Sequence, residues 1–142
     1  MILLDTDHTT FLKYPESARG TRLVERLQSR PAGTVLAISI VTVEEQMRGW
    51  LASVAKERLA RRQVMAYSEL ARLFEYFRKY QIAPFDEKAA EKFDALQTAK
   101  IRLGTMDLKI AAIALVNNAL LLSANRRDFD RVPALRVENW LD

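Results

Sequence analysis

The sequence has no cysteine and only one histidine, His8, among its 142 residues. Without cysteine it can form neither a disulfide framework nor a thiolate metal site, and this composition fits a reducing cytoplasm. With a single histidine it has no histidine pair for general acid–base chemistry. Other side chains must therefore carry any chemistry, and the acidic residues are the strongest candidates.

Long apolar runs are also missing. No segment reaches the roughly 18 apolar residues that span a bilayer, and the N-terminus lacks the pattern of an export signal. We therefore expect a cytoplasmic protein without a membrane partner. The length suits one domain over residues 1–142. A formal charge of +4 and a pI of about 9.6 favour a polyanionic partner, either nucleic acid or an acidic protein.

Short apolar segments alternate with helical patterns along the chain. Pro84 marks one of these segments as an edge strand, because proline cannot donate to a central strand. The predicted strands cover residues 1–4, 35–39, 82–85, 120–122 and 136–140. This alternation predicts an α/β sandwich, with a central, mainly parallel sheet flanked by helices.

Helix-start signals lie between these strands. Thr42 and Glu45 match a capping box, and Asp86 and Thr105 are expected to cap two later helices. No glycine or proline occurs from Trp50 to Ala83, and the spacing of apolar residues there predicts one long helix or a tight helical hairpin. The other predicted helices cover 9–27, with breaks near Tyr14-Pro15 and Gly20, then 86–100 and 105–117.

Three acidic residues fall at related places in this pattern. Asp5 ends the first strand, Glu45 lies in the first predicted turn after the second, and Asp107 begins the helix before the third. Ligands of open parallel sheets bind beyond the carboxyl ends of the strands, where Asp5 and Glu45 should lie. Asp107 joins them only if its helix starts beside that crevice, which we do not expect of a helix returning to a parallel strand.

Each acidic residue also has a purely structural interpretation. Asp107 can complement a helix dipole, Glu45 can complete the capping box with Thr42, and Asp5 can cap the helix that follows it. Taken together these interpretations are weaker, because a lone carboxylate at the end of an apolar strand is costly to desolvate. Clustered carboxylates repel one another unless a hard cation such as Mg²⁺ or Mn²⁺ lies between them.

Four ordered blocks of the sequence resemble those of PIN-domain proteins, and most closely the VapC-type toxin ribonucleases. They span essentially the whole chain, and Val137-Glu138-Asn139-Trp140 is similar to the family's ending. The blocks are ILLDTD (2–7), ISIVTVEEQMRG (38–49), GTMDLKIAA (104–112) and LSANRRDF (122–129). The resemblance implies a PIN fold, a homodimer, Mg²⁺- or Mn²⁺-dependent endoribonuclease activity on RNA, and neutralisation by a cognate antitoxin.

The resemblance also implies the metal ligands, which are Asp5, Glu45 and Asp107. Glu44 is excluded because the family's spacing fits Thr42, Glu45 and Gly49. The fourth acidic position of the family falls on Asn125, and Asp128 is a nearby acid that can substitute for it. This leaves open whether the site holds one metal ion or two.

Other residues near these blocks have two interpretations each. The hydroxyls of Thr6, Ser39 and Ser123 can hydrogen-bond the ligating carboxylates, or they can act as helix caps. The cations Lys109, Arg126 and Arg127 can contact RNA phosphates, or they can form an ordinary solvated face. His8 lies close to the site, but we expect it to have a capping or surface role.

Two other functions fit parts of the sequence. Asp5-Thr6-Asp7-His8-Thr9 resembles the Asp-x-Asp-x-Thr motif of haloacid-dehalogenase phosphohydrolases, with Asp5 as nucleophile and Asp7 as acid–base. Alternatively, the chain is a non-catalytic PIN-like module that binds RNA or a protein. The aromatic residues of the predicted hairpin suggest either a covered interaction patch or additional core: Trp50, Phe74, Tyr76, Phe77 and Tyr80.

Overall fold

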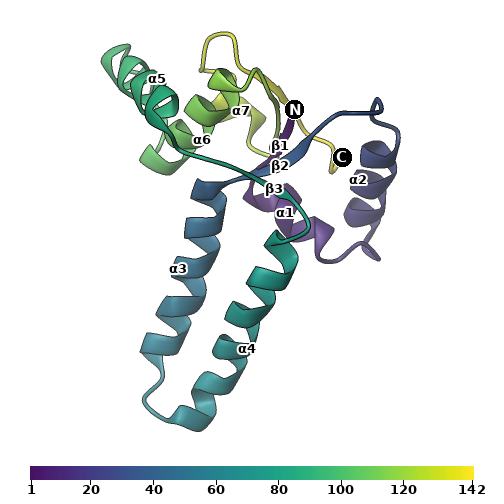
Figure 1. Cartoon of the computed structure of the whole chain (residues 1–142), viewed down its shortest axis with the longest axis vertical. Coiled ribbons are helices and arrows are strands. Elements are labelled where there is room, and N and C mark those ends of the chain that lie inside the picture. The colour runs from purple at the N-terminus through teal and green to yellow at the C-terminus, as the bar shows by residue number, and fades with distance from the viewer.

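A five-stranded, fully parallel sheet with the order β3-β2-β1-β4-β5 organises the chain (Figure 1). The computed structural model describes all residues, 1–142. The strands are β1 (Ile2–Leu4), β2 (Leu36–Ser39), β3 (Gln81–Ala83), β4 (Leu120–Leu122) and β5 (Arg136–Glu138). The predicted α/β sandwich is confirmed, and β3 is an edge strand as expected. Two predicted ends were too late: β3 stops before Pro84, and β5 stops at Glu138.

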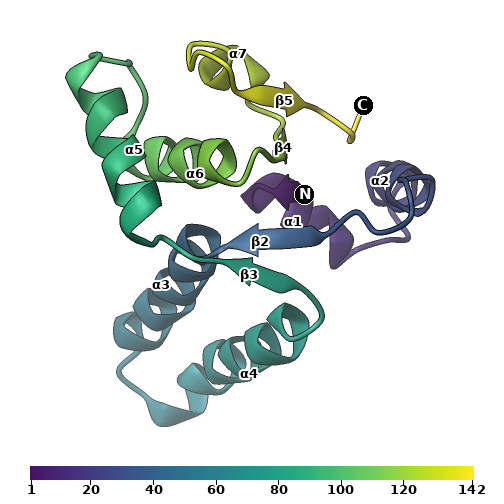
Figure 2. The same cartoon turned by 45° about the horizontal axis from the view of Figure 1, so that its top comes forward.

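Alternate residues of the short strands build two cores, one on each face of the sheet. Leu3 and Leu121 point to the larger core, which contains α5 (Glu87–Thr98) and most of α6 (Thr105–Val116). Leu4 and Leu122 point to the other face, where α2 (Ala18–Gln28) and α4 (Ala60–Phe77) supply the apolar residues. Both faces of the sheet are therefore covered, as a parallel sheet requires. Figure 2 shows α5 and α6 across the sheet from the hairpin that contains α4.

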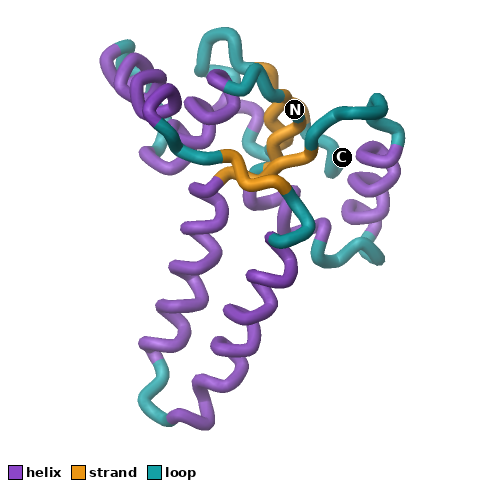
Figure 3. The backbone as a smooth tube through the Cα atoms, viewed as in Figure 1, coloured by secondary structure: helices purple, strands orange, loops and turns teal.

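Two long helices form a hairpin that extends away from the sheet (Figure 3). They are α3 (Ile40–Lys56) and α4, so the tight hairpin is the correct one of the two predicted arrangements. The predicted start at Thr42 was wrong. Ser39 caps α3, because its side chain accepts the N–H of Thr42 at 3.0 Å, and the helix begins two residues earlier.

The first two helices turn sharply after the first strand. Helix α1 (Thr6–Leu12) begins three residues before the predicted start, because Asp5 accepts the N–H of Asp7 and caps it. The expected break near Tyr14-Pro15 separates α1 from α2. Gly20 is not a break, as it lies in the first turn of α2. A Cβ there would lie 2.3 Å from the Tyr14 carbonyl oxygen, so glycine permits this close turn.

The remaining helices lead toward the end of the chain. Asp86 caps α5 as predicted, since its side chain accepts the N–H of Ala89. Thr105 is the first residue of α6 rather than its cap, and Gly104 holds the cap position without a side-chain bond. A short helix, α7 (Arg126–Phe129), follows β4. None of the helices has the length and apolar character needed to cross a membrane.

Candidate metal centre

Asp5 lies where β1 becomes α1, and its side chain is only 8% exposed. Its Oδ1 accepts the N–H of Asp7 at 3.1 Å, and its Oδ2 accepts the hydroxyl of Ser123 at 2.5 Å. Burial raises the pKa of Asp5, the two hydrogen bonds oppose this, and the charges of Asp7 and Asp107 raise it further. The carboxylate is thus held rigidly in a place where negative charge is unfavourable.

Glu45 lies in the second turn of α3, because this helix begins at Ile40. Its Oε2 accepts the hydroxyl of Thr6 at 2.9 Å, which ties it to the start of α1. The capping-box interpretation was therefore wrong: Thr42 is the third helical residue, and Glu45 contacts another helix. The β1–α1 junction and α3 thus bring two acidic residues to the carboxyl edge of the sheet.

Asp107 lies in the first turn of α6 and reaches the same edge. Residues 117–119 connect the end of α6 directly to β4, so this helix ends at the amino edge of the sheet and starts toward the carboxyl edge. The expectation that a returning helix starts on the wrong side was incorrect. Burial raises the pKa of Asp107, and the charges of Glu45, Asp128 and Asp7 add to this effect.

Five carboxyl groups therefore form an acid cluster, defined here as Asp5, Asp7, Glu45, Asp107 and Asp128. No lysine or arginine side chain contributes to the pKa shift of Asp5 or of Asp107. A hard divalent cation prefers such oxygen donors, and each carboxylate oxygen keeps a lone pair beyond the hydrogen bonds described. The donor chemistry thus fits Mg²⁺ or Mn²⁺. In this structure the acidic side chains are too spread out for any three His, Cys, Asp or Glu residues to meet the geometry of a metal site.

Asn125 and Asp128, the two candidates for the fourth acidic position, contact each other. The Asn125 Nδ2 donates to Asp128 Oδ2 at 3.0 Å, and Arg131 lies 3.6 Å from the other oxygen of Asp128. The Asn125 backbone N–H donates to Ser123 Oγ, which itself binds Asp5. Asp128 acts on Asp107 electrostatically, whereas Asn125 positions Asp128.

The predicted supporting hydroxyls divide into two groups. Thr6 and Ser123 bind acidic side chains of the cluster, whereas the hydroxyl of Ser39 caps α3 and donates to Thr42. Ser39 is thus a structural residue.

The predicted cations and the histidine lie in different surroundings. Lys109 lies 5.7 Å from the ring centroid of Phe85, and Arg126 and Arg127 are exposed on α7. His8 is fully buried inside α1, and its Nε2 accepts the backbone N–H of Trp140 at 3.1 Å, so the expected capping or surface role was wrong.

Two polar residues near the cluster carry no signal in the sequence that marks them. Lys13, at the end of α1, donates to the side chain of Gln46 at 2.7 Å. Gln46 follows Glu45 directly on α3. Lys13 and Gln46 are 33 positions apart, so no local pattern reveals this contact.

A parallel sheet with acidic side chains from several helices at its carboxyl edge defines an α/β domain with a candidate metal site. The PIN domain family model matches residues 2–135, and the chain belongs to this family. The resemblance found in the four sequence blocks is thereby confirmed. The matched residues include Asp5-Thr6-Asp7, so the haloacid-dehalogenase alternative is not supported.

Curated relatives cover most of the chain. The sequence is 26% identical over 144 residues to "Ribonuclease VapC2" of Rickettsia felis, covering 97% of this chain and 96% of the relative. It is 29% identical over 110 residues to "Ribonuclease VapC2" of Haemophilus influenzae, covering 75% and 76%.

Solved structures share the fold. The VapBC2 complex of R. felis, solved bound to a promoter DNA fragment, gives a TM-score of 0.68 at 25% identity and covers 99% of both chains. VapBC-1 of H. influenzae gives a TM-score of 0.74 at 22% identity and covers 100% of both.

Proposed function

We propose that this chain is a Mg²⁺- or Mn²⁺-dependent endoribonuclease and the toxin of a toxin–antitoxin pair. Family membership supports this, as do relatives named ribonucleases that align over most of the chain. The solved VapBC complexes with the same fold support an antitoxin as protein partner. We also propose that the protein works in the cytoplasm, where its RNA substrate is found.

In this proposal Asp5, Glu45 and Asp107 hold the metal ion. The observation that carries it is the acid cluster itself. Carboxyl groups from the β1–α1 junction, α3 and α6 lie at one edge of the sheet, and neighbouring carboxylates raise the pKa of Asp5 and of Asp107. Such an arrangement lowers stability unless a ligand compensates for it. Asn125 and Asp128 are the candidates for a fourth position.

The residues of the cluster have separate roles in the proposed catalysis. A bound divalent cation supplies Lewis-acid activation of water and neutralises charge on the scissile phosphate. Ser123 and the Asp7 N–H fix the orientation of Asp5, and Thr6 fixes that of Glu45. Asp107 is less buried and has a raised pKa, which suits it to orient the attacking water and accept its proton. Lys109, Arg126 and Arg127 are candidate contacts to RNA phosphates.

Apolar surface on the hairpin suits protein partners. Phe74, Met65 and Val64 on α4 are 60–71% exposed, and Ile40 and Leu51 line a hollow of about 370 Å³ on α3. Of the aromatic residues predicted to form this patch, Phe74 is exposed, Phe77 is buried, and the others are half-buried. We propose that the antitoxin and a second copy of the chain cover these surfaces, giving a homodimer.

RNA cleavage by the purified chain tests the proposal. We expect turnover with added Mn²⁺, loss of turnover in EDTA, and no turnover by Asp5→Asn, which removes one charge while keeping the side-chain shape. Asp7→Asn is the matched control, because Asp7 is exposed and not a proposed ligand, so its cleavage rate should change only mildly. Full activity of a well-folded Asp5→Asn variant would remove Asp5 from the site. Stable RNA binding without turnover would instead indicate a non-catalytic module.

A further inference from the structure

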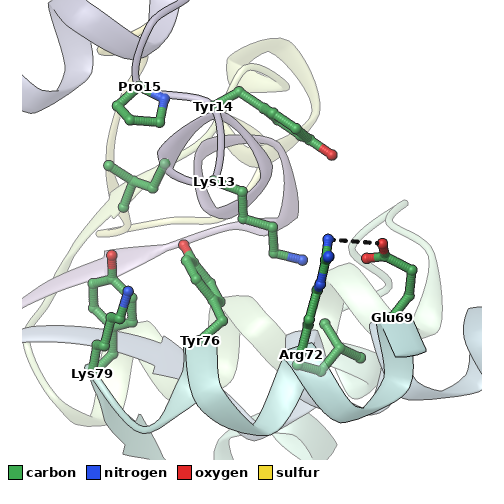
Figure 4. A pocket seen from close by; sticks show the side chains of 10 residues that line it. Lys13, Tyr14, Pro15, Glu69, Arg72, Tyr76 and Lys79 are labelled. Carbon is green, nitrogen blue, oxygen red and sulfur yellow. Dashed lines mark hydrogen bonds and ion pairs between the residues drawn. The ribbon is translucent and has the colours of Figure 1, made fainter. Parts of the chain in front are cut away.

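Two hollows lie side by side where α1 faces the hairpin. The α4 hollow, of about 390 Å³, lies between the end of α1 and α4 (Figure 4). The α3 hollow, of about 370 Å³, lies between α1 and α3. Both are lined by Lys13, Tyr14 and Glu69, so the two hollows adjoin each other along the hairpin, and together they are called the depression here.

One end of this depression lies beside the acid cluster. Thr6 lines the α3 hollow and donates its hydroxyl to Glu45 at 2.9 Å. Gln46, the next residue on α3, also lines this hollow and accepts the Lys13 amino group. A chain molecule that extends from Glu45 past Thr6 can therefore enter the depression at Gln46 and continue to Lys13.

The far end of the depression carries an excess of positive charge. Lys13, Arg72 and Lys79 line the α4 hollow with Glu69 as the only acidic residue, and Glu69 is bonded to Arg72 at 3.3 Å. Figure 4 shows the Lys13 side chain pointing into the space between Tyr76 and Arg72. Its amino group is bonded to a neutral amide, and burial lowers its pKa. An anionic ligand would compensate for this charge.

Aromatic rings accompany the cations. Tyr14 is 56% exposed at the point where the two hollows join. Tyr76 and Tyr80 lie 5.2 Å apart in the α4 hollow, and the Tyr76 hydroxyl is held by the Thr9 carbonyl oxygen. Cations beside an exposed aromatic ring are features that bind single-stranded nucleic acid, whose unpaired bases can stack while its phosphates pair with lysine and arginine.

We infer that the two hollows form a track for single-stranded RNA that leads away from the acid cluster, with phosphates at Lys13, Arg72 and Lys79 and a base on the Tyr14 ring. The inference rests on the proposed function and adds the path of the substrate. A double-stranded RNA would not use it, because its stacked bases cannot reach the Tyr14 ring.

The salt dependence of RNA binding tests the track. The probe is a fluorescein-labelled, unstructured RNA oligonucleotide, with binding followed by anisotropy in EDTA so that the strand stays intact. Removing one lysine–phosphate ion pair should reduce the slope of log K against log salt by about 0.7. We expect Lys13→Gln/Lys79→Gln to lower this slope by about twice that amount and Tyr14→Leu to weaken binding roughly tenfold.

The matched control is Arg61→Gln/Arg62→Gln, which removes the same charge from the distal end of α4, outside both hollows. It should leave the slope close to that of the unmodified protein. Equal slopes for the two double variants, or tighter binding of a duplex of the same length, would overturn the inference. The inference would also be overturned if Lys13→Gln/Lys79→Gln kept RNA binding and lost only the binding of a co-expressed antitoxin, because the hollows would then be a protein-docking site.

Cleavage separates failure of the track from failure of the proposed function. If the unmodified chain cuts RNA with Mn²⁺ and Lys13→Gln/Lys79→Gln cuts it with the same KM, the track is wrong and the ribonuclease stands. If the unmodified chain binds RNA with the expected slopes but never cuts it, the track stands and the ribonuclease proposal fails. For a correct track we expect the double variant to raise KM and leave kcat nearly unchanged.

Discussion

At the scale of single residues, the acid cluster depends on its hydroxyl partners as much as on its carboxylates. Ser123 is fully buried at the end of β4 and comes within 2.5 Å of Asp5, which is 118 positions away in the sequence. Its hydrogen bond is the largest effect that lowers the pKa of Asp5, opposing the burial that raises it. Removing the hydroxyl should therefore change the titration of the site and not only its shape.

Ser123→Ala tests this role. Without the hydroxyl the pKa of Asp5 should rise further, so the acid limb of the pH–rate profile for RNA cleavage should move to higher pH. Removal of such a supporting hydrogen bond typically costs about 10–100-fold in metal affinity or activity. Ser39→Ala is the control, because it removes another buried hydroxyl that only caps α3. This control should cost about 1 kcal/mol of stability and leave the profile in place; identical profiles for all three proteins would contradict the assignment.

His8 predicts a pH dependence of stability. It is fully buried, its Nδ1 has no hydrogen-bond partner, and burial with the nearby charge of Arg26 lowers its pKa to about 4. Its ordinary pKa is 6.5, so between these values the unfolded chain binds a proton that the folded chain does not. Stability is therefore complete above this window and falls as the pH decreases through it, by about 3 kcal/mol in all.

Urea unfolding across this pH range measures the effect of His8. The difference in unfolding free energy between the unmodified chain and His8→Gln isolates the contribution of His8, because the glutamine keeps an acceptor near the Trp140 backbone N–H and does not titrate. We expect this difference to change sharply through the window. A constant difference would show that the histidine does not titrate as described.

At the scale of elements, two glycines within helices should respond in opposite ways to the same substitution. Gly20 lies in the first turn of α2, where a Cβ would be 2.3 Å from the Tyr14 carbonyl oxygen. Gly49 lies on the exposed side of α3, where a Cβ would meet nothing within 4 Å. Neither glycine has a positive φ, so contacts and helix propensity decide the outcome.

Gly20→Ala should destabilise the protein by about 1–3 kcal/mol, because the α1–α2 turn has to open to admit the methyl group. Gly49→Ala should stabilise it by about 0.5–1 kcal/mol through helix propensity alone. Thermal or urea unfolding of the two variants gives both values. Stabilisation by the first substitution would show that the turn opens freely.

Element boundaries show where local signals were sufficient. Asp86 caps α5 as predicted, because its side chain reaches an N–H three residues ahead, within the same segment. Thr42 and Thr105 matched similar patterns, yet their helices begin at Ile40 and Thr105 itself. Helix α3 follows β2 directly, so it begins where the pairing of Ser39 with Ala83 ends, and this depends on the partner strand; α6 follows a loop, and Gly104 holds its cap position.

At the scale of the whole molecule, the metal-free protein should be destabilised by its own acid cluster. Asp5 and Asp107 have pKa values raised above 3.8 in the folded state. The folded chain therefore binds more protons than the unfolded chain between 3.8 and the raised values, and stability falls as the pH rises through this window. A divalent cation bound to the ionised carboxylates should restore that stability.

Thermal unfolding with and without Mn²⁺ tests this without any cleavage assay. At neutral pH, Mn²⁺ at 100 times its Kd should stabilise the folded chain by about 2.7 kcal/mol relative to EDTA. The gain should shrink as the pH falls toward the ordinary range of the carboxyl groups. Asp5→Asn should lose most of the metal effect, whereas Asp7→Asn should keep it. Equal melting temperatures with Mn²⁺ and EDTA would contradict a metal site at the cluster.

Local patterns along the chain were enough to predict the secondary-structure units and the chemistry available to them. Apolar runs marked the strands, helical spacing marked the hairpin, and the lack of cysteine and of a second histidine left carboxylates as the reactive groups. Ordered blocks also identified the PIN family. These features depend on neighbours within a few positions, so local pattern is enough to recognise them.

Which distant side chains come into contact depends on the packing of the folded chain. The direction of α6 places Asp107 at the carboxyl edge, contrary to expectation, and the packing of α1 on α3 joins Thr6 to Glu45 across 39 positions. The same packing buries His8 and aligns Lys13 with the hairpin. Such contacts depend on how helices pack on the two faces of the sheet, and no local sequence pattern records that geometry.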